Sequence, residues 1–302
     1  VTLRQLLLHR SGLPPFRRWF FEIEGREAYQ AAIRAEPLEA DPGTRTAYSD
    51  IGVMTLAWVV ETVAGQHLDR FLERRLFAPL GMADTGFLPD ASLLPRIAPT
   101  ELDTLWRGEM VRGRVHDENA DAFGGVAGHA GLFSTVPDLA GFAELMRSGG
   151  AIPACDSSRP EGAPCPRSRP DAQRLLESAT VRAFTKRADG TSSRALGWDT
   201  PSGRSSAGDL FSAESFGHTG FTGTSLWVDP VRELFVVLLS NRVHPTRANS
   251  RHVPLRRAVH DAVARAVRDV PAVPRDSGDP AATRESDTAA ATSAGIGPVD
   301  PA

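Results

Sequence analysis

Residues 216–241 constrain the fold more strongly than any other part of this 302-residue sequence. Two apolar runs, at 225–228 and 234–239, flank the turn-like segment 229–232, and this pattern is typical of a β-hairpin. The second run is continuously apolar, which predicts a central strand covered on both faces. Just before the hairpin, residues 217–223 contain three glycines, two threonines and one histidine. Because glycines on a strand let a ligand or another backbone approach closely, this stretch is either a binding edge or a glycine-rich lead-in with a surface histidine.

The composition excludes some classes of function. The formal net charge of −3 offers no basic excess, so we expect no nucleic-acid partner. No apolar run approaches the roughly 20 residues that span a bilayer, so no membrane segment is expected in these residues. The sequence begins at Val1 without methionine or a signal peptide, which favours a piece cut from a longer protein.

The two cysteines, Cys155 and Cys165, lie in a stretch rich in proline, serine and arginine. They either form a disulfide that closes a short loop in an oxidising compartment or remain two free thiols. Neither has Cys-x-x-Cys spacing or a histidine neighbour, so they do not predict a zinc site.

Start and stop signals divide the rest of the chain into helices and loops. The clearest helix is 51–64, which is largely apolar, with Ser49 or Asp50 as its N-cap and Gly65 at its end. The patterns predict one domain over 1–270, with an exposed insertion at about 149–170 and a disordered tail at 271–302. Further helices are expected at 3–8, within 16–35, and at 68–76, 135–146, 171–184 and 253–267, with a strand at 195–199.

Residues 88–135 are glycine-rich and irregular, and they contain the polar cluster His116-Asp117-Glu118-Asn119. Such a segment is either a loop around a site or a flexible surface loop. His116 with Asp117 or Glu118 is compatible with a serine triad, but nothing nearby marks a nucleophilic serine. His116 and His129 match no metal-binding spacing, so we interpret them as solvent-facing loop histidines. We therefore expect no metal at these histidines, and no organic cofactor is implied.

Four motifs occur in a fixed order: residues 2–14, Tyr48-Ser49-Asp50, residues 77–87 and His218-Thr219-Gly220. Together they resemble the serine β-lactamase superfamily, in its branch of class C β-lactamases, penicillin-binding proteins and esterases. The resemblance extends from Val1 to about Val267. It implies an α+β fold, with an antiparallel sheet flanked by helices, a mainly helical subdomain, and a site between them. It also implies hydrolysis of amide or ester bonds through an acyl-serine.

The resemblance assigns roles residue by residue. The family motifs are Ser-x-x-Lys, Tyr-x-Asn and Lys-Thr-Gly, and Tyr48 matches the tyrosine that relays a proton. Asp50 stands at the asparagine position and His218 at the lysine position, and the backbone N–H of Phe221 would donate to an oxyanion. The implied catalytic residues are Tyr48, Asp50 and His218, the implied substrate-binding residues are Thr219, Gly220 and Phe221, and the possible cleft loop is His116, Asp117, Glu118 and Asn119.

The first family motif is missing. Lys186 is the only lysine, and Ala183 stands three residues before it, so Ser-x-x-Lys cannot form. We expect that the nucleophile helix and first strands were lost by truncation, which leaves an inactive fragment with an unpaired sheet edge and an exposed apolar face. The alternative is a protein that never had the motif, namely a non-catalytic binding module for a cell-wall peptide or acyl ligand.

Reference pKa values suggest how the remaining groups work. A phenol with a pKa of about 10 is a poor base at neutral pH, and a charged Asp50 nearby would oppose its ionisation. His218, with a reference pKa of about 6.5, would be a part-time cation. The hypothesis is that Tyr48 relays a proton through hydrogen bonds while His218 orients a substrate carboxylate or carbonyl. We expect a monomer from an exported or membrane-anchored parent, acting on a small-molecule or peptidoglycan-derived substrate. The choice among β-lactam, D-Ala peptide and ester stays open.

Overall fold

In the computed structural model, the hairpin predicted around residue 230 forms two strands of a three-stranded antiparallel sheet. Its strands are β7 (Phe216–Thr219), β8 (Ser225–Asp229) and β9 (Leu234–Leu238), in the order β7-β8-β9. His218 pairs with Leu226 across β7 and β8. Within the part of the chain that the structure describes, β8 is therefore the central strand and β9 an outer one. The prediction of a hairpin is confirmed, and the central position expected for the second run is wrong.

The structure describes residues 1–152, 173–203 and 205–267. The predicted disulfide or thiols of Cys155 and Cys165, most of the predicted insertion at 149–170, and the predicted tail at 271–302 lie outside these residues.

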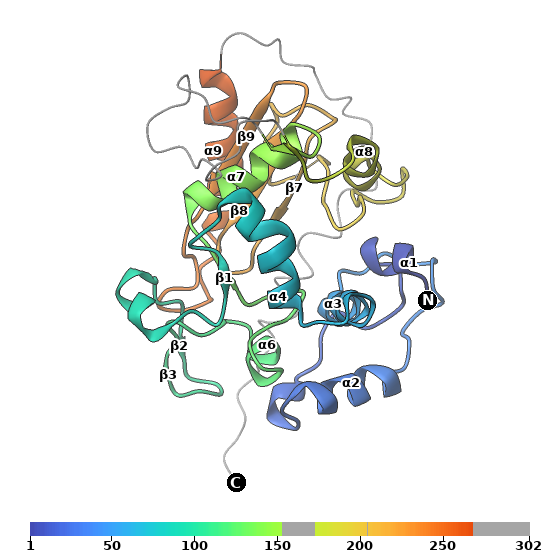
Figure 1. The fold of residues 1–302 in the computed structure, drawn as a ribbon, viewed down its shortest axis with the longest axis vertical. Helices are drawn as coiled ribbons and strands as arrows, with labels where there is room; N and C mark the ends of the chain where they lie inside the picture. The colour runs from blue at the N-terminus through green and yellow to red at the C-terminus, as the bar shows by residue number, and fades with distance from the viewer. Residues whose placement is uncertain (153–172, 204, 268–302) are drawn as a thin grey trace.

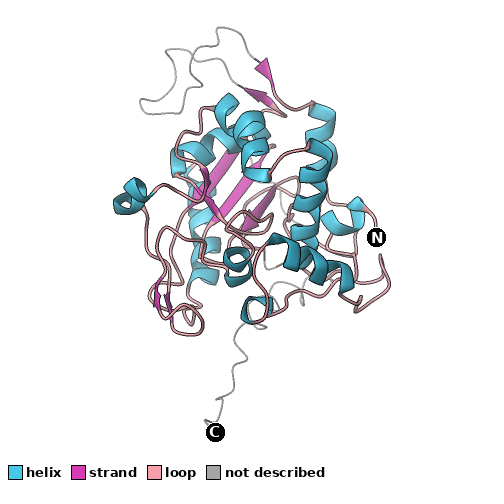
Figure 2. Ribbon diagram, turned by 60° about the horizontal axis from the view of Figure 1, so that its bottom comes forward, coloured by secondary structure: helices cyan, strands magenta, loops and turns pink. Residues whose placement is uncertain are grey.

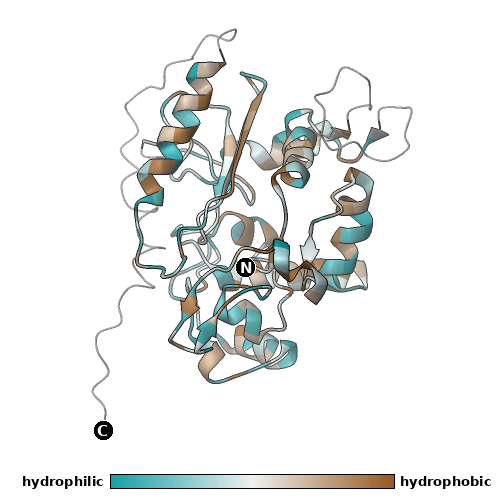
Figure 3. Ribbon diagram, turned by 90° about the vertical axis from the view of Figure 1, so that its left-hand side faces the viewer, coloured by the Kyte–Doolittle hydropathy of each residue, from teal (hydrophilic) through white to brown (hydrophobic). Residues whose placement is uncertain are grey.

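Helices cover both faces of the sheet, which explains why β9 is continuously apolar (Figure 2). On one face, Phe216 and Val228 pack against α7 (Val136–Arg147) and α8 (Ser178–Thr185). On the other face, Trp227 and Val236 pack with Ala207 and Phe211 against α9 (His252–Ala266). Figure 3 shows α9, at the upper left, with hydrophobic and hydrophilic residues side by side, as the four-residue spacing of its valines predicts.

A mainly helical group lies beside the sheet (Figure 1). It comprises α1 (Leu3–Leu7), the 3₁₀ turn Trp19–Phe21, α2 (Arg26–Ala35), α3 (Asp50–Ala64) and α6 (Glu118–Ala122). These elements share one apolar core because each turns its hydrophobic residues inward: Leu6, Trp19, Phe20, Tyr29, Ile33, Ile51, Met54 and Phe123. The α+β architecture of a sheet with flanking helices plus a helical part is thus as predicted.

Shorter elements connect these parts. Helix α4 (Leu68–Leu72) continues through a π-helical turn, Glu73–Phe77, into α5 (Ala78–Leu80), and the 3₁₀ segment Ala91–Arg96 follows. The two-residue strands form antiparallel pairs: β1 (Gly86–Phe87) with β4 (Leu132–Phe133), β2 (Leu102–Asp103) with β3 (Glu109–Met110), and β5 (Ala151–Ile152) with β6 (Gln173–Arg174).

Two predicted elements differ from the structure. The helix expected at 171–184 begins only at Ser178, because Gln173 and Arg174 pair with β5 instead. The strand expected at 195–199 is a turn, in which Gly197 has a positive φ of 78° and Asp199 makes isolated bridges to Arg194 and Gly217. This turn holds Arg194 near the start of β7. No helix in the described ranges combines the length and hydrophobicity needed to cross a membrane.

Candidate active site

Hydrogen bonds from the first fifteen residues fix the N-terminus of α3. Ser49 is the N-cap: its hydroxyl accepts from Gly52 N–H at 3.0 Å and donates to the carbonyl of Pro14 at 2.7 Å. Its own N–H donates to Nδ1 of His9 at 3.2 Å. His9 has a φ of 55°, a left-handed conformation that residues other than glycine rarely adopt. The segment around His9 therefore sets the position of Tyr48, which immediately precedes the cap.

Tyr48 lies among three groups that come from distant parts of the chain. Its ring centroid is 4.4 Å from that of His9 and 6.0 Å from that of His218. The guanidinium carbon of Arg194 lies 5.4 Å from the Tyr48 ring centroid. The structure thus brings together Tyr48 and His218, which the motifs singled out, with His9 and Arg194, to which the motifs assign no role.

The surroundings of Tyr48 keep its phenol protonated. Burial raises the pKa of Tyr48 above its ordinary value, and the charge of Asp50 raises it further, while Arg194 opposes this shift in part. The expectation that Asp50 opposes ionisation of Tyr48 is confirmed in direction. At neutral pH the phenol is therefore protonated and can donate a hydrogen bond, rather than being a phenolate base.

His218 is a neutral imidazole in this site. Its Nδ1 lies 2.9 Å from the carbonyl oxygen of Thr219 and donates to it, and its Nε2 lies 3.4 Å from Nη1 of Arg194. Because an arginine can only donate, Nε2 carries no proton. Burial, and then the charge of Arg194, lower the pKa of His218 below its ordinary value. The expected part-time positive charge on His218 is therefore wrong, because Arg194 already supplies a cation at the same place.

His9 is also neutral. Burial, with the charges of Arg194 and His218, lowers the pKa of His9 to about 3. This agrees with its Nδ1, which accepts the Ser49 N–H and so carries no proton. Of the groups around the Tyr48 ring, Arg194 is thus the one that remains cationic at neutral pH.

A third histidine lies near Asp50 because a glycine lets its loop approach α3. A Cβ on Gly128 would lie 2.6 Å from the carbonyl oxygen of Val53 and 2.8 Å from Cβ of Ala57, so only glycine fits at this contact. The next residue, His129, places its Nε2 3.0 Å from Oδ1 of Asp117, and the same oxygen caps α6 by accepting from Ala120 N–H at 2.8 Å. The His129 side chain is only 2% exposed.

Asp50, Asp117 and His129 form a cluster of charged groups, and each of them shifts the pKa of another. Burial alone would lower the pKa of His129, but the charge of Asp117 and its hydrogen bond, with Asp50, raise that pKa to about 9. Burial would raise the pKa of Asp117, yet His129 brings it below its ordinary value. For Asp50 burial prevails over the opposing charge of His129, and with help from Asp117 raises the pKa to about 6.

The same three side chains are the ones in this region that can offer ligand atoms to a metal ion. One ligand atom from each lies within 4.8 Å of the others. However, a protonated imidazole has no lone pair with which to bind a metal, and here His129 itself balances the carboxylates. We therefore interpret the three groups as an ion cluster beside Tyr48. The prediction of a solvent-facing His129 is wrong, because Gly128 draws its loop onto α3.

His116 is likewise buried, at 8% exposed, and so the prediction of a solvent-facing ring is wrong for it too. Its Nε2 lies 2.8 Å from Oε2 of Glu101, and Nε of Arg247 lies 2.7 Å from the same oxygen. Arg247 also bonds Oε1 of Glu118 at 2.5 Å. These ion pairs hold the predicted cleft loop against the chain that follows β9.

The His116 ring also contacts Phe221, the residue after Gly220. It stacks on the Phe221 ring with centroids 5.6 Å apart and an interplanar angle of 29°. The guanidinium carbon of Arg242 lies 4.0 Å from the centroid of the same ring. Phe221 is therefore held between an imidazole and a guanidinium, although it remains 39% exposed.

The backbone after β7 is braced by two arginines. The carbonyl of Phe221 accepts from Nε of Arg242 at 2.7 Å, and the carbonyl of Gly220 accepts from Nη2 of Arg256 at 2.6 Å. Gly220 N–H donates to the carbonyl of Thr224 at 2.8 Å. Over the described ranges, the N–H of Phe221 has no hydrogen-bond partner, so this donor is available to a ligand.

Asn119 has a different environment from the rest of the predicted cleft loop. It is 3% exposed, and its Oδ1 accepts from the Tyr29 hydroxyl at 3.0 Å and from Phe20 N–H at 3.2 Å. Its Nδ2 donates to the carbonyl of Arg17 at 2.7 Å. These bonds tie α6 to the rest of the helical group, so Asn119 acts in packing rather than at the site around Tyr48.

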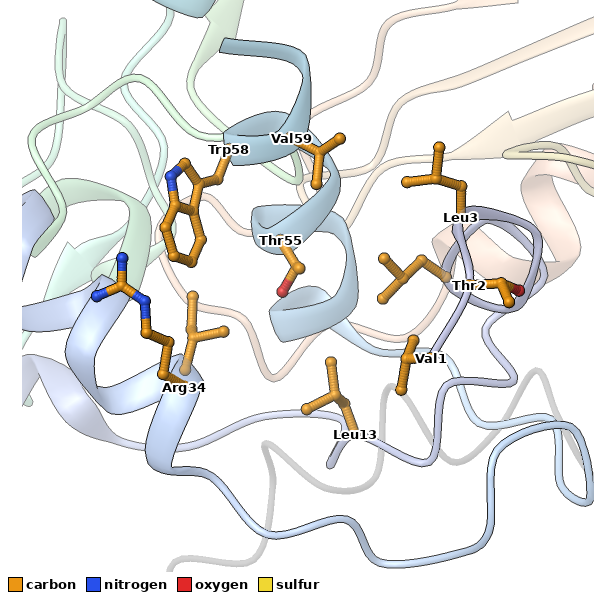
Figure 4. A pocket seen from close by; sticks show the side chains of 10 residues that line it. Val1, Thr2, Leu3, Leu13, Arg34, Thr55, Trp58 and Val59 are labelled. Atoms are coloured by element: carbon orange, nitrogen blue, oxygen red, sulfur yellow. The ribbon is translucent and has the colours of Figure 1, made fainter. Parts of the chain in front are cut away.

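A pocket of about 560 Å³ lies elsewhere, between α1, α2 and α3 (Figure 4). Its lining is largely apolar, and the guanidinium carbon of Arg34 lies 4.4 Å from the ring centroid of Trp58 there. Neither Tyr48 nor His218 lines it. We therefore locate the candidate site by the chemistry around Tyr48 rather than by cavity volume.

Comparison with protein-family models assigns this chain to a known family. The family model described as Beta-lactamase matches residues 1–261. Curated relatives include a protein of Salmonella schwarzengrund (strain CVM19633) named "Putative D-alanyl-D-alanine carboxypeptidase", which is 34% identical over 238 residues. That match covers 74% of this chain and 51% of the relative, so the chain spans about half the length of the curated relatives it matches.

Solved structures share the fold at lower identity. A penicillin-binding protein homologue from Caulobacter crescentus matches with a TM-score of 0.60 and 19% identity, covering 87% of this chain and 71% of the other. A β-lactamase from Mycobacterium bovis matches with a TM-score of 0.54 and 23% identity, covering 88% of this chain and 74% of the other. The predicted β-lactamase/transpeptidase-like fold is therefore confirmed.

Proposed function

The chain belongs to the Beta-lactamase family, and we propose that the protein containing it is a serine hydrolase that removes the terminal D-alanine from peptidoglycan-derived peptides. The observation that carries the proposal is the contact of a protonated Tyr48 with His218, which stands three residues before the free N–H of Phe221. Similarity to D-alanyl-D-alanine carboxypeptidases supports a peptide substrate over a β-lactam or an ester.

In the proposed reaction, a serine hydroxyl attacks the carbonyl carbon of the penultimate residue. The serine proton passes through the Tyr48 hydroxyl to the nitrogen of the leaving D-alanine as the peptide bond breaks. The carbonyl oxygen, negatively charged in the intermediate, accepts from Phe221 N–H, a type of donor worth roughly 10²–10³ in rate. Water then hydrolyses the acyl-serine and restores the enzyme.

No Ser-x-x-Lys motif occurs in these 302 residues, because Lys186, the only lysine, is preceded at the required spacing by Ala183. We propose that the acylating serine and its lysine come from another part of the protein. The 302 residues alone would then bind substrate without forming an acyl-enzyme.

Labelling of the protein encoded by the complete open reading frame tests the proposal. The full-length protein is treated with a fluorophosphonate or penicillin probe, and the adduct is located by intact mass and peptide mapping. The 302-residue chain, treated in parallel, is the control and should remain unlabelled. An adduct on a serine of a Ser-x-x-Lys motif outside these residues is the expected result. Absence of any adduct in the full-length protein would instead favour the non-catalytic binding module for a cell-wall peptide or acyl ligand.

A further inference from the structure

Residues 7–10 contact the chain on both sides of the candidate site. On one side, the His9 carbonyl accepts from Ala47 N–H at 2.8 Å, and Nδ1 of His9 accepts from Ser49 N–H at 3.2 Å. The residues before and after Tyr48 are thus bonded to one histidine, whose ring also contacts the Tyr48 ring. This side of the site is therefore fixed to the segment 7–10.

Arg10 reaches both sides of the site with one side chain. Its Nε donates to Oγ1 of Thr46 at 2.9 Å, two residues before Tyr48. Its Nη1 and Nη2 donate to the two carboxylate oxygens of Asp189 at 2.8 and 3.1 Å, and Nη2 also donates to the Thr191 hydroxyl. The Arg10 side chain is 17% exposed. The planar guanidinium suits this two-bond contact with a carboxylate, which a lysine cannot reproduce.

A short loop connects Asp189 to Arg194. Ala188 N–H donates to the carbonyl of Arg194 at 3.0 Å, so the two ends of this loop are bonded to each other. Beyond Arg194, Gly197 N–H donates to the carbonyl of Leu7 at 3.1 Å. The N-terminal segment therefore holds the chain on both sides of Arg194.

We propose that Arg10 is a positioning residue of the site. Through Asp189, it holds the Arg194 guanidinium over the Tyr48 ring and beside His218. The inference rests on the proposed function for the chemistry of Tyr48, but the position of Arg194 does not depend on turnover. A partly exposed ion pair adds little to stability, so breaking it should displace Arg194 rather than unfold the chain.

NMR titration of the His218 ring nitrogens in the 302-residue chain tests the position of Arg194. Burial, and then the charge of Arg194, lower the pKa of His218. If the guanidinium moves away, this pKa should rise by on the order of one unit. Both Arg10→Gln and Asp189→Asn should produce the rise. The other groups that face His218 are the rings of Tyr48 and His9, the Thr219 carbonyl, Asp199 and Arg256.

The two variants distinguish displacement of Arg194 from a direct effect of the deleted charge. Loss of the Arg10 cation would by itself raise a histidine pKa, whereas loss of the Asp189 anion would by itself lower it. A rise in both variants is expected only if both act through Arg194. The double variant should shift the His218 pKa no further than either single one, because the same contact cannot be broken twice.

Three outcomes of the titration would overturn the proposal. They are an unchanged His218 pKa in Arg10→Gln, a lowered pKa in Asp189→Asn, and shifts that add up in the double variant. Arg96→Gln is the matched control, because Arg96 donates two hydrogen bonds to the carboxylate of Asp84, each at 2.8 Å. It should leave the His218 pKa at the wild-type value, and an equal shift there would also count against Arg10. Urea unfolding of each variant verifies that the fold is retained.

Acylation of the full-length protein gives the catalytic readout. With a penicillin probe, Arg10→Gln should slow the acylation step by roughly 10- to 100-fold and leave the apparent affinity for the probe unchanged, because a displacement of about 1 Å can cost that much. Acylation of Arg10→Gln at the wild-type rate would overturn the positioning role. If the wild-type protein forms no adduct at all, the hydrolase proposal falls, and the His218 titration still decides whether Arg10 positions Arg194.

Discussion

Nε2 of His129 lies 3.0 Å from Oδ1 of Asp117, and this ion pair sits beside Asp50 at the start of α3. Its position depends on Gly128, whose missing side chain lets the loop touch the α3 backbone. The pair therefore couples the glycine-rich loop to α3, the helix whose N-cap follows Tyr48. This coupling makes the stability of the chain depend on pH.

The first prediction concerns stability between pH 6.5 and 9. The pKa of His129 is raised from 6.5 to about 9, so its stabilising charge is complete below pH 6.5 and disappears as pH rises through 9. The free energy of unfolding should fall by on the order of 2 kcal/mol across this window. Urea unfolding at several pH values measures it. A flat profile would contradict the assignment.

Two variants test this prediction: His129→Asn removes the ion pair, and His67→Asn is the control at an exposed histidine. Removing His129 leaves two partly buried carboxylates without their counter-charge, so the variant should lose on the order of 2 kcal/mol at pH 6.5. It should also lose less stability than the wild type between pH 6.5 and 9. His67, whose side chain is 67% exposed, should reproduce the wild-type profile.

The second prediction is that Asp50→Asn stabilises the chain at pH 7.5. Burial and Asp117 raise the folded pKa of Asp50 from 3.8 to about 6, so its ionised form is disfavoured in the folded state. Above pH 6 this residue therefore destabilises the fold, and the amide should recover on the order of 1 to 2 kcal/mol. The gain should shrink as pH falls through 6 toward 4. Thermal unfolding of the wild type and of Asp50→Asn at pH 7.5 and at pH 4.5 measures the gain in stability. A gain that is larger at pH 4.5 would contradict the prediction.

These examples show which parts of the site the sequence could reveal. Tyr48, Asp50 and His218 carry motif signals, and the capping rule predicts the helix that begins beside Ser49. Arg194 has no such signal, because it lies in a turn and becomes significant only where the fold brings it to His218. The buried state of His116 and His129 depends on partners far away in the chain, namely Glu101 and the α3 backbone. Local pattern can predict elements, but not such tertiary contacts.

The sheet shows the same limit, because local pattern predicts its strands but not their order. The apolar run in β9 predicts burial, and α7 and α9 supply it, but the order of strands depends on which neighbours pair. The expected strand at 195–199 was wrong because Gly197 adopts a positive φ that turns the chain after Arg194. That turn brings the Arg194 guanidinium over the Tyr48 ring.

The third prediction tests why residue 217 is glycine. A Cβ there would lie 2.4 Å from both the carbonyl oxygen of Leu226 and Cδ2 of Trp227, and Trp227 is fully buried. Gly217→Ala should therefore destabilise the chain by about 1–3 kcal/mol, as overpacking does. Gly141→Ala, in α7 with nothing within 4 Å of the added Cβ, is the control and should be neutral or stabilising. Chemical denaturation of both variants measures this, and equal stabilities would contradict the packing argument.

The last prediction separates the two tyrosines of the sequence, Tyr29 and Tyr48. The Tyr29 hydroxyl donates to Asn119, whereas no described residue hydrogen-bonds the Tyr48 hydroxyl. Tyr29→Phe should therefore cost about 1 kcal/mol of stability and leave the chemistry unchanged. Tyr48→Phe should retain stability but, in the full-length protein, slow acylation by a penicillin probe by roughly 10²–10⁴, because the proton relay is lost. Measuring acylation rates and unfolding for both variants decides the matter: equal acylation rates in Tyr48→Phe and the wild type would remove Tyr48 from the mechanism.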